Sequence, residues 1–248
     1  MNETYYLGAY WGPRQEDAQS CAQRLAHMVR LLEPIDPLFA RWFKSAKTLK
    51  ESLKRPLDTD LEGLRKYVQR VMMKDDRRMP MPDLGFSVWL WNGGSGGDDV
   101  WFDSLCGGYW ERANNRCVLR APEEGAIGGR VLTTVFQTDV LRAMTTAWDP
   151  DWGVAISNKH RDIIEKKCPD VLVGWVTYLS RRLGQVPPLP APVRIEPVGE
   201  LGTLIILTPE RFTASNPEHL ELAERVRERL DKAGLLQRPA SRAPLPNG

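Results

Sequence analysis

The segment that most constrains how this chain can fold is the corner formed by residues 134–157. Thr134 and Gln137 have the spacing of a capping box, in which side-chain oxygens bind unpaired amides at the start of a helix. The segment between Gln137 and Pro150 carries apolar side chains at helical spacing, namely Val140, Leu141, Met144 and Trp148. Asp149-Pro150-Asp151 ends this helix, because the residue before a proline is pushed out of the α region. Residues 153–157 then predict a buried strand, so the segment indicates a structural corner rather than a catalytic one.

Composition and charge exclude several classes of protein. The 248 residues include 34 basic and 32 acidic side chains, a net charge of +2. This balance argues against a general nucleic-acid-binding protein, which needs a basic excess on one face, and against an acidic mimic of DNA. No apolar run approaches the roughly 20 residues of a membrane helix. The first residues, Met1-Asn2-Glu3-Thr4, lack the basic and apolar parts of a signal peptide, so we expect a cytoplasmic protein.

The cysteines and histidines do not form a recognisable metal site. Cysteines stand at positions 21, 106, 117 and 168, with no Cys-x-x-Cys pair, and the three histidines are scattered. Structural zinc sites usually show close pairs of ligands, so we expect neither a metal nor another cofactor. Cysteine packs as a small hydrophobic residue, and we expect buried free thiols in a reducing compartment.

Strands mostly follow strands along this chain. They are expected at 4–11, 84–92, 100–107, 116–121, 153–157, 170–180, 193–196 and 202–208, and residues 93–97 should form a hairpin tip. The strand 193–196 should lie at an edge of the sheet. The strands 84–92 and 202–208 should lie in the sheet centre, because both are apolar on both faces. Helices are expected over 18–32, from 61, over 134–148, over 158–167 after an Asn cap, and from 217 to a stop at Gly234. This order predicts an α+β fold with a mixed or mainly antiparallel sheet and helices packed on it. Residues 1–236 should form a single domain, and the proline-rich tail 237–248 should be disordered.

A search for catalytic groups gives little. Ser157 and His160 lie three residues apart, but no Gly-x-Ser-x-Gly turn surrounds Ser157, so a capping role for Ser157 is favoured. A metal-dependent hydrolase or nuclease is the alternative function, and it would bind magnesium through carboxylates. Its candidate ligands are Asp98, Asp103, Asp149 and Glu196. The Glu-x-Lys pattern that many such nucleases carry at the end of a strand is missing, and we therefore favour a protein that is not an enzyme.

Several motifs, in order, resemble one family of bacterial proteins. They are Tyr5-Tyr6-Leu7-Gly8-Ala9-Tyr10-Trp11-Gly12-Pro13-Arg14, Ile35-Asp36-Pro37-Leu38-Phe39, Leu84-Gly85-Phe86-Ser87-Val88, Trp148-Asp149-Pro150-Asp151-Trp152, Gly174-Trp175-Val176-Thr177-Tyr178-Leu179-Ser180 and Gly202 to Phe212. Together they cover the chain from about residue 5 to residue 236, and they resemble the Immunity protein 52 family. The resemblance implies a protein that binds and silences a cognate toxin in the producing cell, with no catalytic residues. It also implies that the toxin is often a restriction-endonuclease-like nuclease, in some cases one delivered by type VI secretion.

The family motifs resemble folding determinants, so the toxin-binding face has to be inferred from physical chemistry. A nuclease presents a basic, metal-binding cleft, and an inhibitor should offer acidic groups with aromatic anchors. The first candidates are Asp98, Asp99, Trp101, Tyr109, Trp110 and Glu111, and the second are Asp149 and Asp151. Structural roles are the alternatives: Trp101 in the core, Asp149 as a turn cap, and the 108–115 loop as a cover for one end of the sheet. Inhibition from a surface away from the toxin's active site, and the oligomeric state, stay open.

Overall fold

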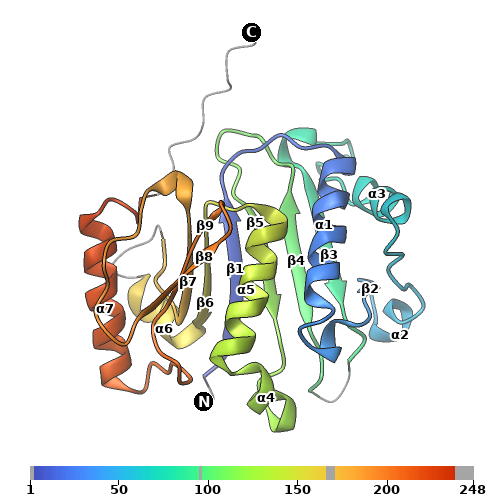
Figure 1. Cartoon of the computed structure of the whole chain (residues 1–248). Coiled ribbons are helices and arrows are strands. Elements are labelled where there is room, and N and C mark those ends of the chain that lie inside the picture. The colour runs from blue at the N-terminus through green and yellow to red at the C-terminus, as the bar shows by residue number, and fades with distance from the viewer. Residues whose placement is uncertain (1–2, 95–96, 166–170, 238–248) are drawn as a thin grey trace.

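The computed structural model describes residues 3–94, 97–165 and 171–237, and a single antiparallel sheet crosses this part of the chain (Figure 1). Its nine strands lie in the order β2-β3-β4-β5-β1-β6-β7-β9-β8. They are β1 (Tyr5–Trp11), β2 (Phe43–Lys44), β3 (Phe86–Trp91), β4 (Trp101–Cys106), β5 (Asn115–Arg120), β6 (Trp152–Ser157), β7 (Val176–Ser180), β8 (Arg194–Val198) and β9 (Gly202–Ile206). The α+β prediction with a mainly antiparallel sheet is confirmed.

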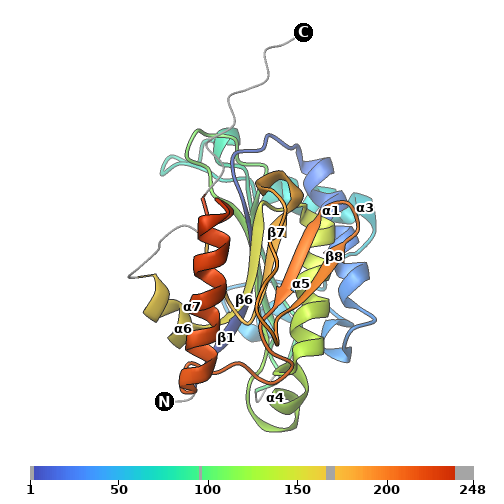
Figure 2. The same cartoon turned by 60° about the vertical axis from the view of Figure 1, so that its left-hand side comes forward.

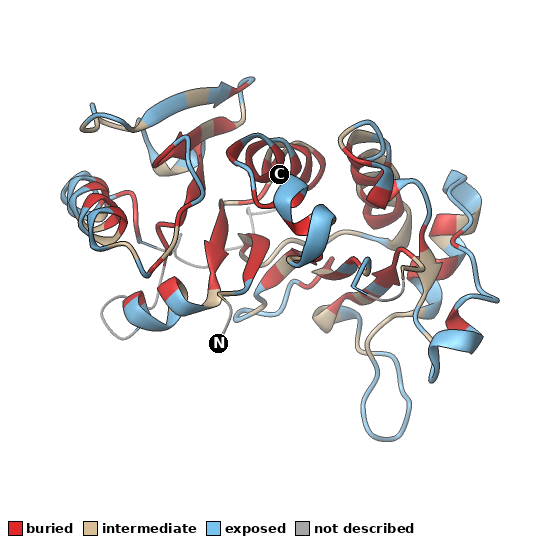
Figure 3. Ribbon diagram, turned by 90° about the horizontal axis from the view of Figure 1, so that it is seen from below, coloured by how far each residue is buried: buried red, intermediate tan, exposed pale blue. Residues whose placement is uncertain are grey.

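Helices cover both faces of this sheet. They are α1 (Ala18–Leu32), α2 (Leu49–Ser52), α3 (Leu61–Arg70), α4 (Gly125–Val131), α5 (Thr134–Trp148), α6 (Asn158–Ile164) and α7 (Pro217–Lys232), with short 3-10 helices η1 (Pro37–Phe39), η2 (Pro82–Leu84) and η3 (Arg181–Leu183). In Figure 2, α1, α3 and α5 lie on one side of the sheet, and α6 and α7 lie on the other. The helices bury the sides that face the sheet and expose the outer sides (Figure 3), which is the pattern of a three-layer core.

The predicted corner at the end of α5 is confirmed and lies at the centre of the packing. Trp148 is fully buried, and its ring stacks on Trp11 of β1 with centroids 5.5 Å apart. The helix covers residues 134–148 as expected, but its predicted cap, Thr134, is wrong by one residue. Thr133 is the cap, and its Oγ1 accepts a hydrogen bond from the N–H of Phe136 at 3.3 Å. The Thr134 hydroxyl instead donates to the carbonyl of Pro209 at 2.7 Å, because it faces the chain segment after β9.

Strands β3, β4 and β5 form the predicted meander, joined by a hairpin whose residues 95–96 lie outside the described residues. The prediction of a central strand at 84–92 is wrong: β3 is next to the short edge strand β2. Its two faces also differ. Val88 and Leu90 are buried on the side of α1 and α3, whereas 46% of Trp89 is exposed on the other side.

The C-terminal half follows the predicted order with three corrections. Strand β9 lies beside the edge strand β8 and not in the sheet centre, and β7 begins at Val176 rather than at residue 170. The cap of α6 is Ser157 rather than Asn158, and this helix ends at Ile164. The start of α7 is confirmed, with the Asn216 side chain accepting from the N–H of Glu218 and Gly234 following the helix at φ +71°. Of the predicted disordered tail, residues 238–248 lie outside the described residues.

Candidate functional site

The residues predicted to bind a partner lie at two opposite ends of the sheet. Residue pairs across β1 place Trp11 opposite Asn115 and Tyr10 opposite Trp152, so the loop 107–114 and the turn 149–151 share one end, the upper end in Figure 1. Asp98, Asp99 and Trp101 lie at the start of β4, and Tyr109, Trp110 and Glu111 follow its end. The six residues of β4 span about 20 Å, so the two groups do not form one small contact patch.

At the upper end, Arg182 binds both candidate carboxylates of the turn. Its Nη1 donates to the two Asp149 carboxylate oxygens at 2.7 and 2.9 Å, and its Nη2 lies 3.4 Å from Asp151 Oδ1. The N–H of Gly12 donates to the second Asp151 oxygen at 3.0 Å. Asp149 caps the helix in the left-handed conformation with φ 46°, which aspartate tolerates better than most residues. Both carboxylates therefore hold the corner together, and their contact with a partner stays a prediction.

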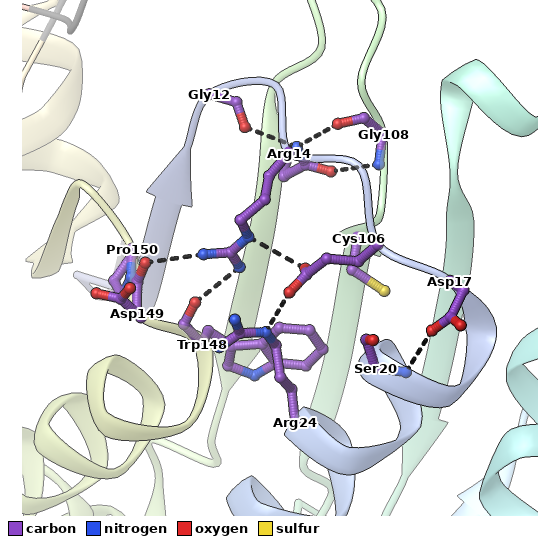
Figure 4. A network of polar contacts seen from close by, with 12 residues as sticks. Gly12, Arg14, Asp17, Ser20, Arg24, Cys106, Gly108, Trp148, Asp149 and Pro150 are labelled. Atoms are coloured by element: carbon purple, nitrogen blue, oxygen red, sulfur yellow. Dashed lines mark hydrogen bonds and ion pairs between the residues drawn. The ribbon is translucent and has the colours of Figure 1, made fainter. Parts of the chain in front are cut away.

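Two further arginines bind the end of α5. Arg14 donates to the carbonyls of Asp149 and Trp148 at 3.0 and 2.8 Å (Figure 4). Arg24 donates to the carbonyl of Ala147 at 3.2 Å. Glu16 lies between these arginines and accepts from Arg24 at 2.6 Å and from Arg14 at 3.1 Å. The last carbonyls of a helix lack partners within it and carry partial negative charge, so cations stabilise them.

Burial lowers the pKa of the Arg14 guanidinium, although Glu16 beside it acts in the opposite direction. The Arg14 side chain also lies over the Trp11 ring at 4.9 Å. Sequence patterns gave no sign of this network, because Arg14 and Arg24 are more than 120 residues away from the carbonyls that they bind. The network indicates a rigid structural corner.

The 107–114 loop exposes its two aromatic side chains, as predicted. The exposed fractions are 40% for Tyr109 and 49% for Trp110, and the backbone N–H groups of both residues donate to the carbonyl of Asp83 at 2.9 and 3.0 Å. Tyr109 also lines a groove of about 430 Å³ between the start of α1, α3 and η2. The loop is thus held in place while its rings face solvent, and its role in binding stays a prediction.

At the lower end, Asp98 is exposed and Asp99 is half-buried. The Asp99 carboxylate accepts a hydrogen bond from the Trp101 indole N–H at 2.6 Å. The Trp101 ring stacks on the buried Trp91 with centroids 5.9 Å apart, yet 36% of Trp101 is exposed. The alternative of a core position for Trp101 is therefore wrong.

The model of the Immunity protein 52 family matches residues 3–239, which is nearly the whole chain. The chain belongs to the Immunity protein 52 family. A solved structure, the Pseudomonas aeruginosa T6SS protein PA0821, is similar in fold with a TM-score of 0.52 and 13% sequence identity. The similarity covers 92% of this chain and 73% of that protein. No curated protein matches the chain.

Family membership supports an immunity role in general terms and suggests a role without catalysis. The carboxylates proposed to bind magnesium in the alternative function, a metal-dependent hydrolase or nuclease, lie in separate parts of the fold. Asp103 pairs with Arg116 within the sheet, Asp149 with Arg182 at the upper end, and Glu196 with Arg142 and Arg194 on the edge strand β8. In the part of the chain that the structure describes, no group of three or more histidine, cysteine, aspartate or glutamate side chains could hold a metal ion. Within the same residues, no helix has the length and apolar character needed to cross a bilayer.

Ser157 and the described cysteines of this Immunity protein 52 family member have structural roles. Ser157 Oγ accepts from the backbone N–H of His160 at 3.1 Å, which confirms the capping role that was favoured over catalysis for Ser157. Cys21, Cys106 and Cys117 are free and buried, whereas Cys168 lies outside the described residues. A hydrogen bond with Cys21 and burial raise the pKa of the Cys106 thiol, which keeps it protonated and unreactive.

Proposed function

We propose that this chain binds and neutralises a cognate toxin in the cell that produces both proteins, and that it does so without turnover. The observation that carries this proposal is the match of the Immunity protein 52 family over residues 3–239. The exposed rings of Tyr109, Trp110 and Trp101 add support, because aromatic side chains contribute a large share of the energy at protein interfaces.

We infer further that the toxin is a restriction-endonuclease-like nuclease used in type VI secretion, and that neutralisation takes place in the cytoplasm. The basic cleft of such a nuclease complements acidic groups. The exposed carboxylates of Asp98 and Glu111 fit this chemistry. The proposed contacts are Asp98, Asp99, Trp101, Tyr109, Trp110 and Glu111, with Asp149 and Asp151 as a second set whose charges Arg182 already offsets.

Co-expression with the protein encoded by the neighbouring gene tests this proposal. We expect that protein alone to stop growth and degrade nucleic acid, and the pair to grow and to co-purify. The variant Glu196→Gln, at a carboxylate that the alternative function needs, should protect as well as the wild-type chain. Protection that disappears in Glu196→Gln while the variant stays folded would favour the metal-dependent hydrolase instead, and a pair that neither associates nor restores growth would contradict the proposal.

A further inference from the structure

One part of the sheet carries large exposed side chains where a helix would otherwise pack. Residues that lie opposite one another on paired strands point to the same side of a sheet. The register places Trp91 opposite Trp101 and Trp101 opposite Arg120, and it places Trp89 opposite Asp103 in the neighbouring row. These side chains therefore share one side of β3, β4 and β5. It is the side away from α1, because Cys106, on the other side of β4, lies against Cys21 of α1.

We use the term open sheet face for Trp89, Trp101, Leu105, Arg116 and Arg120. Trp89 and Arg120 are exposed, 36% of Trp101 is exposed, and Leu105 and Arg116 are half-buried. Helices α6 and α7 lie on this side of the sheet, and the loop of residues 74–81, teal in Figure 2, projects on the same side. The open sheet face belongs to β3, β4 and β5, whereas α6 packs on β6. The open sheet face is thus a part of the sheet with exposed side chains, and other elements project on the same side of the sheet.

The two tryptophans of this face are held in fixed orientations. The Trp89 indole N–H donates to Ser87 Oγ at 3.0 Å, and the Trp101 indole N–H donates to Asp99 at 2.6 Å. Trp101 is also supported from within by the stacked ring of Trp91. Side chains that are already ordered lose less conformational entropy on binding, and exposed aromatic rings on a rigid strand are therefore efficient anchors.

The charges on this face are only partly paired among the described residues. Asp103 lies 3.3 Å from Arg116 and offsets its charge, whereas the Asp99 carboxylate is bound to an indole. Among the residues that the structure describes, Arg120 makes no ion pair, although it is directly opposite Trp101. Arginine beside tryptophan is the composition that is enriched where protein interfaces are strongest, and a free guanidinium favours a carboxylate in the partner.

We propose that the open sheet face is the surface on which the cognate toxin docks, with Trp89 and Trp101 as apolar anchors and Arg120 bound to a toxin carboxylate. The inference rests on the proposed function, and it names the face that the function uses. It shares Trp101 with the contacts predicted from the sequence and adds Trp89, Arg116 and Arg120. Metal-dependent nucleases hold magnesium through carboxylates inside their basic cleft. A toxin of the proposed class therefore offers a carboxylate to Arg120 and cationic groups to Asp98 and Asp99 at the start of β4.

The test is the affinity of the purified chain for the purified product of the neighbouring gene, measured with the metal chelated. We expect Trp89→Ala to raise Kd about 30-fold, as for a hot-spot residue. Arg120→Glu should raise Kd about tenfold or more and slow association most at low salt. Arg30→Glu, the same charge change at an exposed position on α1, should bind like the wild-type chain. Unchanged circular dichroism and melting temperature establish that each variant is folded.

The outcomes separate this inference from the proposed function. Wild-type affinity in both Trp89→Ala and Arg120→Glu, with loss of affinity in Trp110→Ala, would place the toxin on the upper loop and overturn the open sheet face alone. A concentration-dependent dimer of the wild-type chain that Arg120→Glu dissociates without loss of toxin affinity would show that a second copy covers the face. A wild-type chain that does not bind the neighbouring product would remove both proposals.

Discussion

Replacing Trp148 by alanine is expected to lower the free energy of unfolding by about 4 kcal/mol, the usual cost of truncating a fully buried aromatic side chain. The Trp148 ring stacks on Trp11, and its indole N–H lies 3.1 Å from the sulfur of Met28. It therefore joins α5 to β1 and α1. Domains are stable by only about 5–15 kcal/mol, so the variant should lose a large part of its stability.

Urea unfolding followed by circular dichroism measures this loss, and Trp110→Ala is the matched control. Trp110 is 49% exposed on the 107–114 loop, where a substitution should change the free energy of unfolding by about 0.5 kcal/mol or less. Equal destabilisation by the two substitutions would contradict the central position assigned to the corner at the end of α5.

His160 is expected to make the protein less stable at acidic pH. The side chain is buried, its ring stacks on Phe212 at 4.8 Å, and its Nδ1 has no hydrogen-bond partner among the described residues. Burial lowers the pKa of His160 from 6.5 to about 4, although the nearby carboxylates of Glu3 and Glu224 act in the opposite direction. Protonation of His160 is thus less favourable in the folded chain than in the unfolded chain.

The sign follows from this difference. Between about pH 6.5 and pH 4 the unfolded state binds more protons, so the free energy of unfolding falls as the pH is lowered through this range and is unaffected by His160 above it. The lowered pKa corresponds to a decrease of about 3 kcal/mol in the free energy of unfolding between pH 7 and pH 4. Urea unfolding at pH 7, 5.5 and 4 measures it, and His160→Phe, which keeps a ring against Phe212, should show a smaller decrease. Parallel pH profiles for the two proteins would contradict the assignment.

The elements of the fold could be predicted where the cause is local. The stop at Asp149-Pro150-Asp151 and the Asn216 cap depend on residues within a few positions of each other, and both are confirmed. Strand order could not be predicted in the same way. The apolar run 202–208 correctly indicated a strand that is buried on both faces. This strand, β9, nevertheless lies beside the edge strand β8 and not in the sheet centre. It is buried there because α5 packs on one of its faces, and Ile205 is buried on the other face.

The candidate site shows the same limit. The exposure of Tyr109 and Trp110 follows from their place in a loop between two strands, which the sequence indicates. The exposure of Trp89 depends on which part of the sheet the helices leave uncovered, and the ion pair of Asp149 with Arg182 joins residues 33 positions apart. No pattern within a short window carries this information, and the apolar run 84–92 therefore predicts a central strand although Trp89 is exposed.

The most direct test of the central claim is a titration of toxin activity. The nuclease activity of the neighbouring gene's product is measured at fixed concentration while the purified chain is added in increasing molar ratio. A binding inhibitor without turnover predicts that the activity falls linearly and reaches zero near one chain per toxin, the same at short and long incubation. Activity that persists at excess chain, or that disappears with time at a small fraction of one equivalent, would contradict neutralisation by stoichiometric binding.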